Sequence, residues 1–181
     1  FSKSDLFFTI FRYLIFFLQA VKGFVLAYFL GPFFLGIYGF IMLYQQYLSY
    51  SNLGIEYSIN SEVAVLDVNN IIEKQKLINS AFTWTLFMSI LLMLISAVIF
   101  VYKLELFPFH NSHEYIFIIM LLTVLSHFQK IFVNIFRIEK KLKPIILSEF
   151  VTVSSLFLII FLFDGIDLIN AMLYGWTLIV L

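Results

Sequence analysis

Several ionisable side chains stand inside otherwise apolar stretches of the sequence, among them Arg12, His127, Lys130 and Glu149. In such a setting Arg and Lys can pair with an anionic ligand through charge-assisted hydrogen bonds. For Arg12 two interpretations stay open, a cation that lines a cavity and a side chain that snorkels to the lipid headgroups. Lys130 and Glu149 form either a structural ion pair or a titrating coupling site. His127 is either a neutral hydrogen-bonded group or a proton carrier near neutral pH.

Uncharged polar residues recur at helical spacing around these groups. At 100° per residue, Gln19 shares a helix face with Arg12, and Asn134 shares one with Lys130. Polar side chains within a bilayer usually face the interior of a helix bundle or a wet cavity. We therefore predict one hydrophilic cavity. The candidate substrate-binding residues are Arg12, Lys130, Gln19, Gln45, His127 and Asn134, with Glu149 as the candidate ion-coupling residue.

Hydrogen bonding between helices is the alternative explanation for these stripes. It is the preferred explanation for Thr85, Ser89 and Ser96, because Ser and Thr pack helices without any charge. Arg12 and Lys130 are not needed for such packing, so the cavity is preferred for their helices.

The sequence offers little for covalent or metal chemistry. It has no Cys, which excludes disulfides and thiolate sites. His110, His113 and Glu114 lie in one short loop, and two His with one Glu are a weak zinc signal. Phosphate-loop glycines, an HExxH pattern and the spacing of a catalytic triad are all absent. We expect neither an enzyme nor a bound metal or cofactor.

The elements that must position these residues follow from the composition. Hydrophobic residues make up 62% of the 181 residues and charged residues 12%. A soluble domain is about half apolar and about a quarter charged. This composition excludes a soluble enzyme, a nucleic-acid-binding domain and a disordered tail. Apolar runs such as 89–102 do not alternate, so an all-α membrane protein, a polytopic helical bundle, is predicted instead of a β-barrel.

A helix needs about 20 apolar residues to cross a bilayer. The chain is predicted to be a single transmembrane domain, 1–181, with these spans: 6–30, 33–53, 77–102, 115–136, 145–163 and a truncated 168–181. Gly31-Pro32 is expected to stop the first span in a tight external turn. Because the chain begins at Phe1 and ends within an apolar run, we expect it to be the N-terminal part of a longer protein.

Orientation follows from the Lys and Arg residues of the short loops. With the N-terminus in the cytoplasm, the inner segments hold Lys3, Lys74, Lys76, Arg137, Lys140, Lys141 and Lys143. The outer segments hold Lys103, and Lys22 if it snorkels outward. The excess predicts a cytoplasmic N-terminus.

The stretch 26–64 resembles the N-terminal part of bacterial polysaccharide flippases of the Wzx type. The matching pieces are LAYFLGP at 26–32, LGIYGF at 35–40 and NLGIEYSIN at 52–60. These flippases belong to the superfamily that also holds multidrug and toxin exporters. The resemblance covers the whole chain in hydropathy, and about its first third in motif.

The resemblance implies a two-lobed transporter of the bacterial inner membrane, of which this chain is the first lobe with about five to six spans. Its cargo would be an oligosaccharide linked to undecaprenyl pyrophosphate, moved by alternating access for O-antigen, capsule or exopolysaccharide assembly. Arg12 and Lys130 would pair with the pyrophosphate. Partners would include membrane lipids and the polysaccharide polymerase or chain-length machinery, with no nucleic acid.

Two other classes stay open. A drug or cation antiporter of the same superfamily would favour carboxylates inside the membrane, and Glu149 is the one acid clearly inside a predicted span. A membrane scaffold without transport would make the polar stripes packing seams. A membrane-bound glycosyltransferase is a weaker option, because no loop is long or acidic enough for a sugar-nucleotide site.

Overall fold

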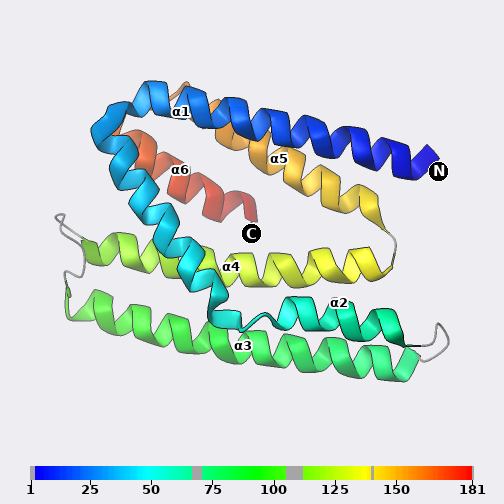
Figure 1. Cartoon of the computed structure of the whole chain (residues 1–181). Helices are drawn as coiled ribbons and strands as arrows, with labels where there is room; N and C mark the ends of the chain where they lie inside the picture. The colour runs from blue at the N-terminus through cyan, green and yellow to red at the C-terminus, as the bar shows by residue number, and fades with distance from the viewer. Residues whose placement is uncertain (1–2, 67–70, 105–111, 140, 181) are drawn as a thin grey trace. The chain divides into compact units, whose positions relative to one another are not determined.

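Every regular element among the described residues is a helix, which confirms the all-α class. The computed structural model describes residues 3–66, 71–104, 112–139 and 141–180. Its elements are α1 (Lys3–Ser49), a 3-10 turn η1 (Tyr50–Asn52), α2 (Ile55–Val65), α3 (Ile71–Val101), α4 (Ser112–Ile138), α5 (Leu142–Ile160) and α6 (Gly165–Val180) (Figure 1).

Four of the described helices are long and apolar enough to cross a membrane, so the membrane class is also supported. They cover Thr9–Asn52, Ile71–Val101, His113–Ile138 and Leu142–Ile160. The helix α6 has 16 residues, fewer than a full span needs. The predicted count of six spans and the two-lobed architecture stay predictions.

The turn expected at Gly31-Pro32 takes the form of a kink within one long helical element. Gly31 has φ 65° and ψ 174°, values that glycine alone adopts readily. Pro32 has no N–H to donate and a φ suited to the first turn of a helix, so a second helical stretch starts directly after it. The chain thus leaves helical geometry at Gly31 and changes direction between two helical stretches of α1 (Figure 1).

The chain divides into two compact units, residues 1–40 with 140–181 and residues 41–139. In the first unit α1 packs on α5 through Ile15, Ile146 and Val153, all buried. Both helices start at the same side of this unit (Figure 1). Farther along, the rings of Phe29 and Phe161 meet edge to face, with centroids 5.7 Å apart. These contacts fix which residues of α1 face α5.

In the second unit α4 lies against both α2 and α3. In the most apolar 18-residue stretch of α4, 50% of the residues are buried, compared with 28% in the corresponding stretch of α3. Of these two helices, α4 is therefore the more enclosed. The short α2 comes from the polar stretch 56–76 and packs through Ile59 and Val63 against Ala81 of α3. Ile138, at the end of α4, joins the same cluster.

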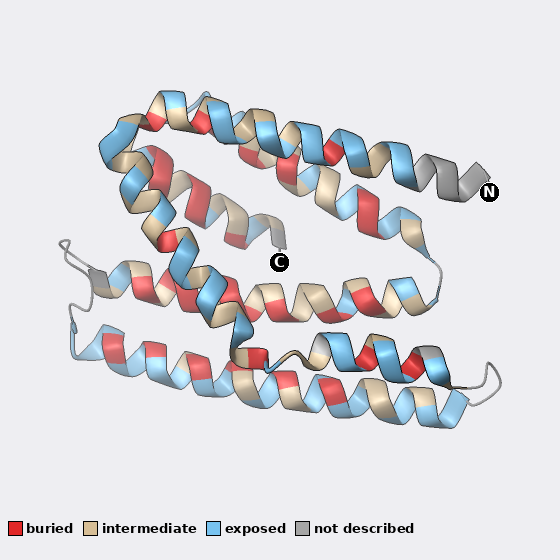
Figure 2. Cartoon of the chain, viewed as in Figure 1, coloured by how far each residue is buried: buried red, intermediate tan, exposed pale blue. Residues whose placement is uncertain are grey.

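Large apolar side chains are exposed along every long helix (Figure 2). Tyr13, Phe17 and Phe24 of α1 are each more than half exposed, as are Leu94 and Val98 of α3. Contiguous apolar surface of this kind is costly in water but is the ordinary surface of a helix in lipid. The exposed faces of the spans are therefore assigned to the acyl chains.

Candidate functional site

An ion pair links the first and fifth spans inside the first unit. The guanidinium Nη1 of Arg12 in α1 donates to both carboxylate oxygens of Glu149 in α5. The two residues are 137 positions apart in sequence. Their side chains are 30% and 24% exposed, so the pair is mostly but not fully enclosed.

The apolar core of this unit determines the position of the pair. Arg12 lies one turn before the buried Ile15, and Glu149 lies one turn after Ile145 and one turn before Val153, both buried. Residues three or four apart stack on one helix face, so packing of the apolar residues brings the two charges together. The ring of Phe16, one turn from Arg12, lies 5.2 Å from the guanidinium carbon. A cation over an aromatic face is further stabilised by the ring quadrupole.

The pair gives the site two chemical abilities. A guanidinium binds a carboxylate or a phosphate with the same two-pronged donor geometry, so an anionic ligand can compete with Glu149 for Arg12. A cation that binds Glu149 would in turn release the arginine. Two interpretations were open for Arg12, snorkelling and cavity lining. The structure adds a third, in which the cation is paired with a carboxylate inside the protein.

The other candidate residue of the first unit is Gln19, two turns after Arg12 in α1. Its side chain is exposed. A spacing of seven residues returns to nearly the same face of a helix, so Gln19 extends the polar stripe that starts at Arg12.

Three candidate residues of the second unit lie in α4, where two of them are buried. His127 is fully buried, and its Nε2 donates to the backbone carbonyl of Ser49 over 3.1 Å. The oxygen of Asn134 accepts a hydrogen bond of 3.0 Å from Asn60 of α2. Lys130, one turn from each of them, is half-buried.

A further buried contact in this unit joins the 3-10 turn η1 to α3. Asn52 and Thr85 are both fully buried and exchange two hydrogen bonds of 3.2 Å. Asn52 follows Gln45, the remaining candidate, which is half-buried near the end of α1. Together with the His127–Ser49 contact, these bonds join η1 and the end of α1 to α3 and α4. Asn52, Thr85, His127 and Asn134 thus bond one helical element to another.

Two hypotheses join residues that belong to different units. One is the structural pair of Lys130 with Glu149, and the other is the single cavity faced by Arg12 and Lys130. Both stay predictions. Within the first unit, the carboxylate of Glu149 is engaged by Arg12.

The loop residues considered for zinc do not form a described site. His110 lies outside the described residues. Among the residues that are described, no group of three or more His, Asp or Glu side chains is placed to hold a metal ion.

Sequence reasoning missed the partner of Arg12 and the role of Asn60. The Arg12–Glu149 contact could have been predicted from depth in the membrane. Both residues lie one to two turns from the predicted inner ends of their spans, and so at a similar depth. No comparable signal pointed to Asn60, which lies in the polar stretch between spans.

Comparison with known proteins adds no relative. No protein-family model, no curated protein and no solved structure matches the chain. The resemblance to polysaccharide flippases therefore depends on the three short pieces between residues 26 and 60 and on the hydropathy of the chain.

Proposed function

We propose that this chain is the first lobe of a transporter that moves an anionic lipid-linked oligosaccharide across the bacterial inner membrane by alternating access. The cargo class is an oligosaccharide on undecaprenyl pyrophosphate. The observation that carries the proposal is the Arg12–Glu149 ion pair, a partly exposed guanidinium held between two apolar spans.

The ion pair supports an anionic cargo for a physical reason. A pyrophosphate that leaves water loses strong hydration, so cations or hydrogen-bond donors must replace it. Arg12 offers such donors, and its partial exposure leaves room for a ligand to approach. In the absence of cargo, Glu149 keeps the arginine from being an unpaired charge among apolar side chains, a costly state. Cargo binding is then an exchange of one anionic partner for another.

The same exchange gives Glu149 its proposed role in coupling. The carboxylate of Glu149 competes with the cargo for Arg12, and a coupling ion that binds Glu149 ends the competition. Binding of the coupling ion and binding of the anionic cargo are thereby linked through one arginine.

A drug or cation antiporter is the second candidate, because the pair also places a carboxylate within the spans. In that protein Glu149 would bind the cationic cargo and Arg12 would be displaced from it. The two candidates make opposite demands on the two residues, which a substitution experiment separates.

The experiment is export of surface polysaccharide in the cells that encode the protein, measured with Arg12→Ala, Arg12→Lys and Arg12→Glu. Membrane abundance of each variant is measured in parallel. We expect Arg12→Ala to reduce export about tenfold or more relative to the amount of protein in the membrane, the loss expected for one charge-assisted contact. Arg12→Lys should restore part of it, and Arg12→Glu should restore none.

Lys143→Ala is the matched control, since Lys143 is an exposed cation of α5. It should export normally. Normal export by all three Arg12 variants would refute a cationic contact to the cargo. Export that falls only in proportion to the membrane abundance of the protein would favour the scaffold, in which the pair only holds the helices.

A further inference from the structure

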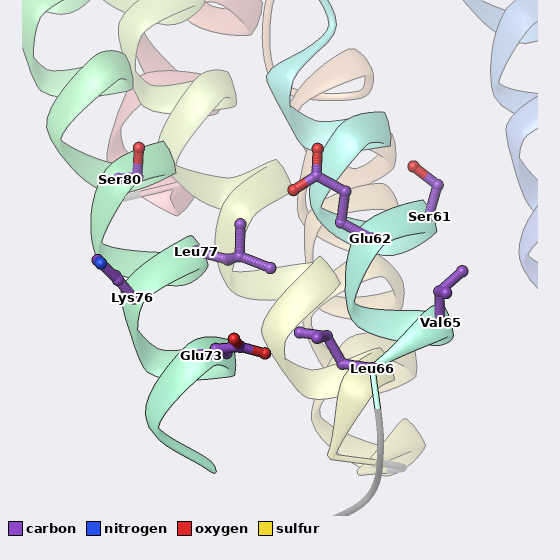
Figure 3. A pocket seen from close by; sticks show the side chains of 8 residues that line it. All are labelled: Ser61, Glu62, Val65, Leu66, Glu73, Lys76, Leu77 and Ser80. Atoms are coloured by element: carbon purple, nitrogen blue, oxygen red, sulfur yellow. The ribbon is translucent and has the colours of Figure 1, made fainter. Parts of the chain in front are cut away.

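A groove of about 840 Å³ lies between α2 and the start of α3 in the second unit. Its floor is apolar and is formed by Leu66 after α2 and Leu77 of α3, which project toward one another (Figure 3). The carboxylates of Glu62 and Glu73 lie over the gap between the two helices, and Lys76 stands on the α3 wall (Figure 3). The groove thus combines an apolar floor with charges of both signs.

Buried contacts beneath the groove hold its two walls in place. Ile59 and Val63 of α2 pack on Ala81 of α3, with Leu77 and Ile138 against the same cluster. Since packed apolar contacts of this kind resist rearrangement, the groove exists before any ligand arrives.

The length of α3 places the groove at the level of the lipid headgroups. The helix has 31 residues, so it is about 46 Å long at 1.5 Å per residue. The hydrocarbon core of a bilayer is about 30 Å thick. The excess length must extend beyond the core, and Glu73 and Lys76 stand in the first two turns of α3. Charged side chains at that position lie where headgroups lie.

Apolar side chains beside the groove point to contact with acyl chains. Val65, which lines the groove, is 88% exposed, and Ile72, next to the groove residue Glu73 in sequence, is 81% exposed. Exposed branched apolar residues are unfavourable in water but not against lipid. A ligand that satisfies this surface therefore has an apolar part as well as a charged part.

We propose that the groove binds a zwitterionic phospholipid whose headgroup carries a primary ammonium and a phosphate, as in phosphatidylethanolamine. The ammonium donates to Glu62 and Glu73, and the phosphate lies against Lys76. An acyl chain follows Leu66, Leu77 and the exposed Val65. This site does not depend on the proposed transport function.

The charges select this headgroup over the two other common kinds. A choline headgroup has no N–H, so it cannot donate to the two carboxylates. A glycerol headgroup leaves the lipid with a net negative charge and no cation, so Glu62 and Glu73 repel it. Only a headgroup with both an N–H cation and a phosphate matches both charge types of the groove.

The test is native mass spectrometry of the whole chain in detergent micelles, titrated with phosphatidylethanolamine, phosphatidylcholine and phosphatidylglycerol of identical acyl chains. We expect phosphatidylethanolamine to bind about three- to fivefold more tightly than either of the others, the range for partly exposed charge pairs. The double variant Glu62→Gln/Glu73→Gln should abolish this preference. Lys76→Gln should weaken phosphatidylethanolamine binding by a similar factor.

Matched controls lie at the other end of the α3 and α4 pair. Glu114→Gln and Lys103→Gln remove one exposed acid and one exposed cation there, and both should leave the preference intact. Circular dichroism shows whether each variant keeps its helices. Equal binding of the three lipids, tightest binding of phosphatidylglycerol, or an unchanged preference in the folded double variant would each overturn the proposal.

Discussion

Removing one charge of the Arg12–Glu149 pair should destabilise the protein more than removing both. Glu149→Gln leaves the guanidinium between apolar spans without its anionic partner, and Arg12→Gln leaves the carboxylate in the same position. In the double variant Arg12→Gln/Glu149→Gln neither charge remains, so much of the loss should be recovered. The three variants with the parent protein form a double-mutant cycle.

The expected coupling follows from the exposure of the pair. Two charges about 4 Å apart attract by about 4 kcal/mol at an effective dielectric constant of about 20. Desolvation of both groups offsets much of this attraction. The remaining exposure, 30% and 24%, lets solvent screen the pair further. We therefore expect a coupling free energy of about 1–2 kcal/mol, between the values for surface and buried pairs.

The assay is the free energy of unfolding in mixed micelles, measured by titration with a denaturing detergent and followed by circular dichroism. The charge-swapped variant Arg12→Glu/Glu149→Arg provides a second check, because it should recover part of the stability lost by Arg12→Glu alone. Additivity of the single changes to within about 0.5 kcal/mol, together with no recovery in the swap, would show that the two charges do not interact.

Two further predictions use pairs of similar substitutions with different expected results. Thr85→Val should lower the free energy of unfolding by about 1–3 kcal/mol, because it removes a hydrogen-bond partner from the buried Asn52. Ser89→Ala should change the free energy of unfolding by less than about 0.5 kcal/mol, since the buried Ser89 hydroxyl makes no hydrogen bond among the described residues. The same detergent titration distinguishes them, and equal losses would refute the role of the Asn52 bond. Gly31→Ala should lower the free energy of unfolding by about 1–3 kcal/mol, because a residue with a Cβ is strained at its φ of 65°. Gly23→Ala should raise the free energy of unfolding by about 0.5–1 kcal/mol, because alanine favours a helix more than glycine does. At both sites the added Cβ has no atom from another part of the chain within 4 Å. Thermal unfolding measures both changes. A shift of the unfolding midpoint in the same direction for the two variants would show that backbone conformation at Gly31 is not the cause.

The membrane class and the positions of most spans could be predicted from the sequence because they depend on local properties. A run of apolar residues in lipid must satisfy its own backbone hydrogen bonds, and a helix does so without any other part of the chain. For this reason α3, α4 and α5 overlap the spans predicted at 77–102, 115–136 and 145–163. Their observed ends differ by a few residues, since helix ends depend on capping and fraying.

The short helix α2 shows where a local signal was present but weak. Ile55, just before the polar stretch 56–76, and Ile59 and Val63 within it recur every four residues, a spacing typical of an amphipathic helix. Their burial against Ala81 and Ile138 creates the floor and walls of the groove. The groove itself could not be predicted, because it depends on which two helices lie side by side.

The kink at Gly31 illustrates a limit of a different kind. Gly-Pro predicts an interruption of the helix, and the interruption is present. A tight turn and a kink use the same two residues, since both need a positive φ and tolerate a missing N–H.

By itself the sequence determined that this protein is helical, that it lies in a membrane and that a few charges stand in its spans. Only the tertiary structure decided which of those charges meet. Arg12 and Glu149 are 137 residues apart, and periodicity relates residues only within one helix. Their contact results from the packing of Ile15 with Ile146 and Val153, which sets the rotation of α1 against α5.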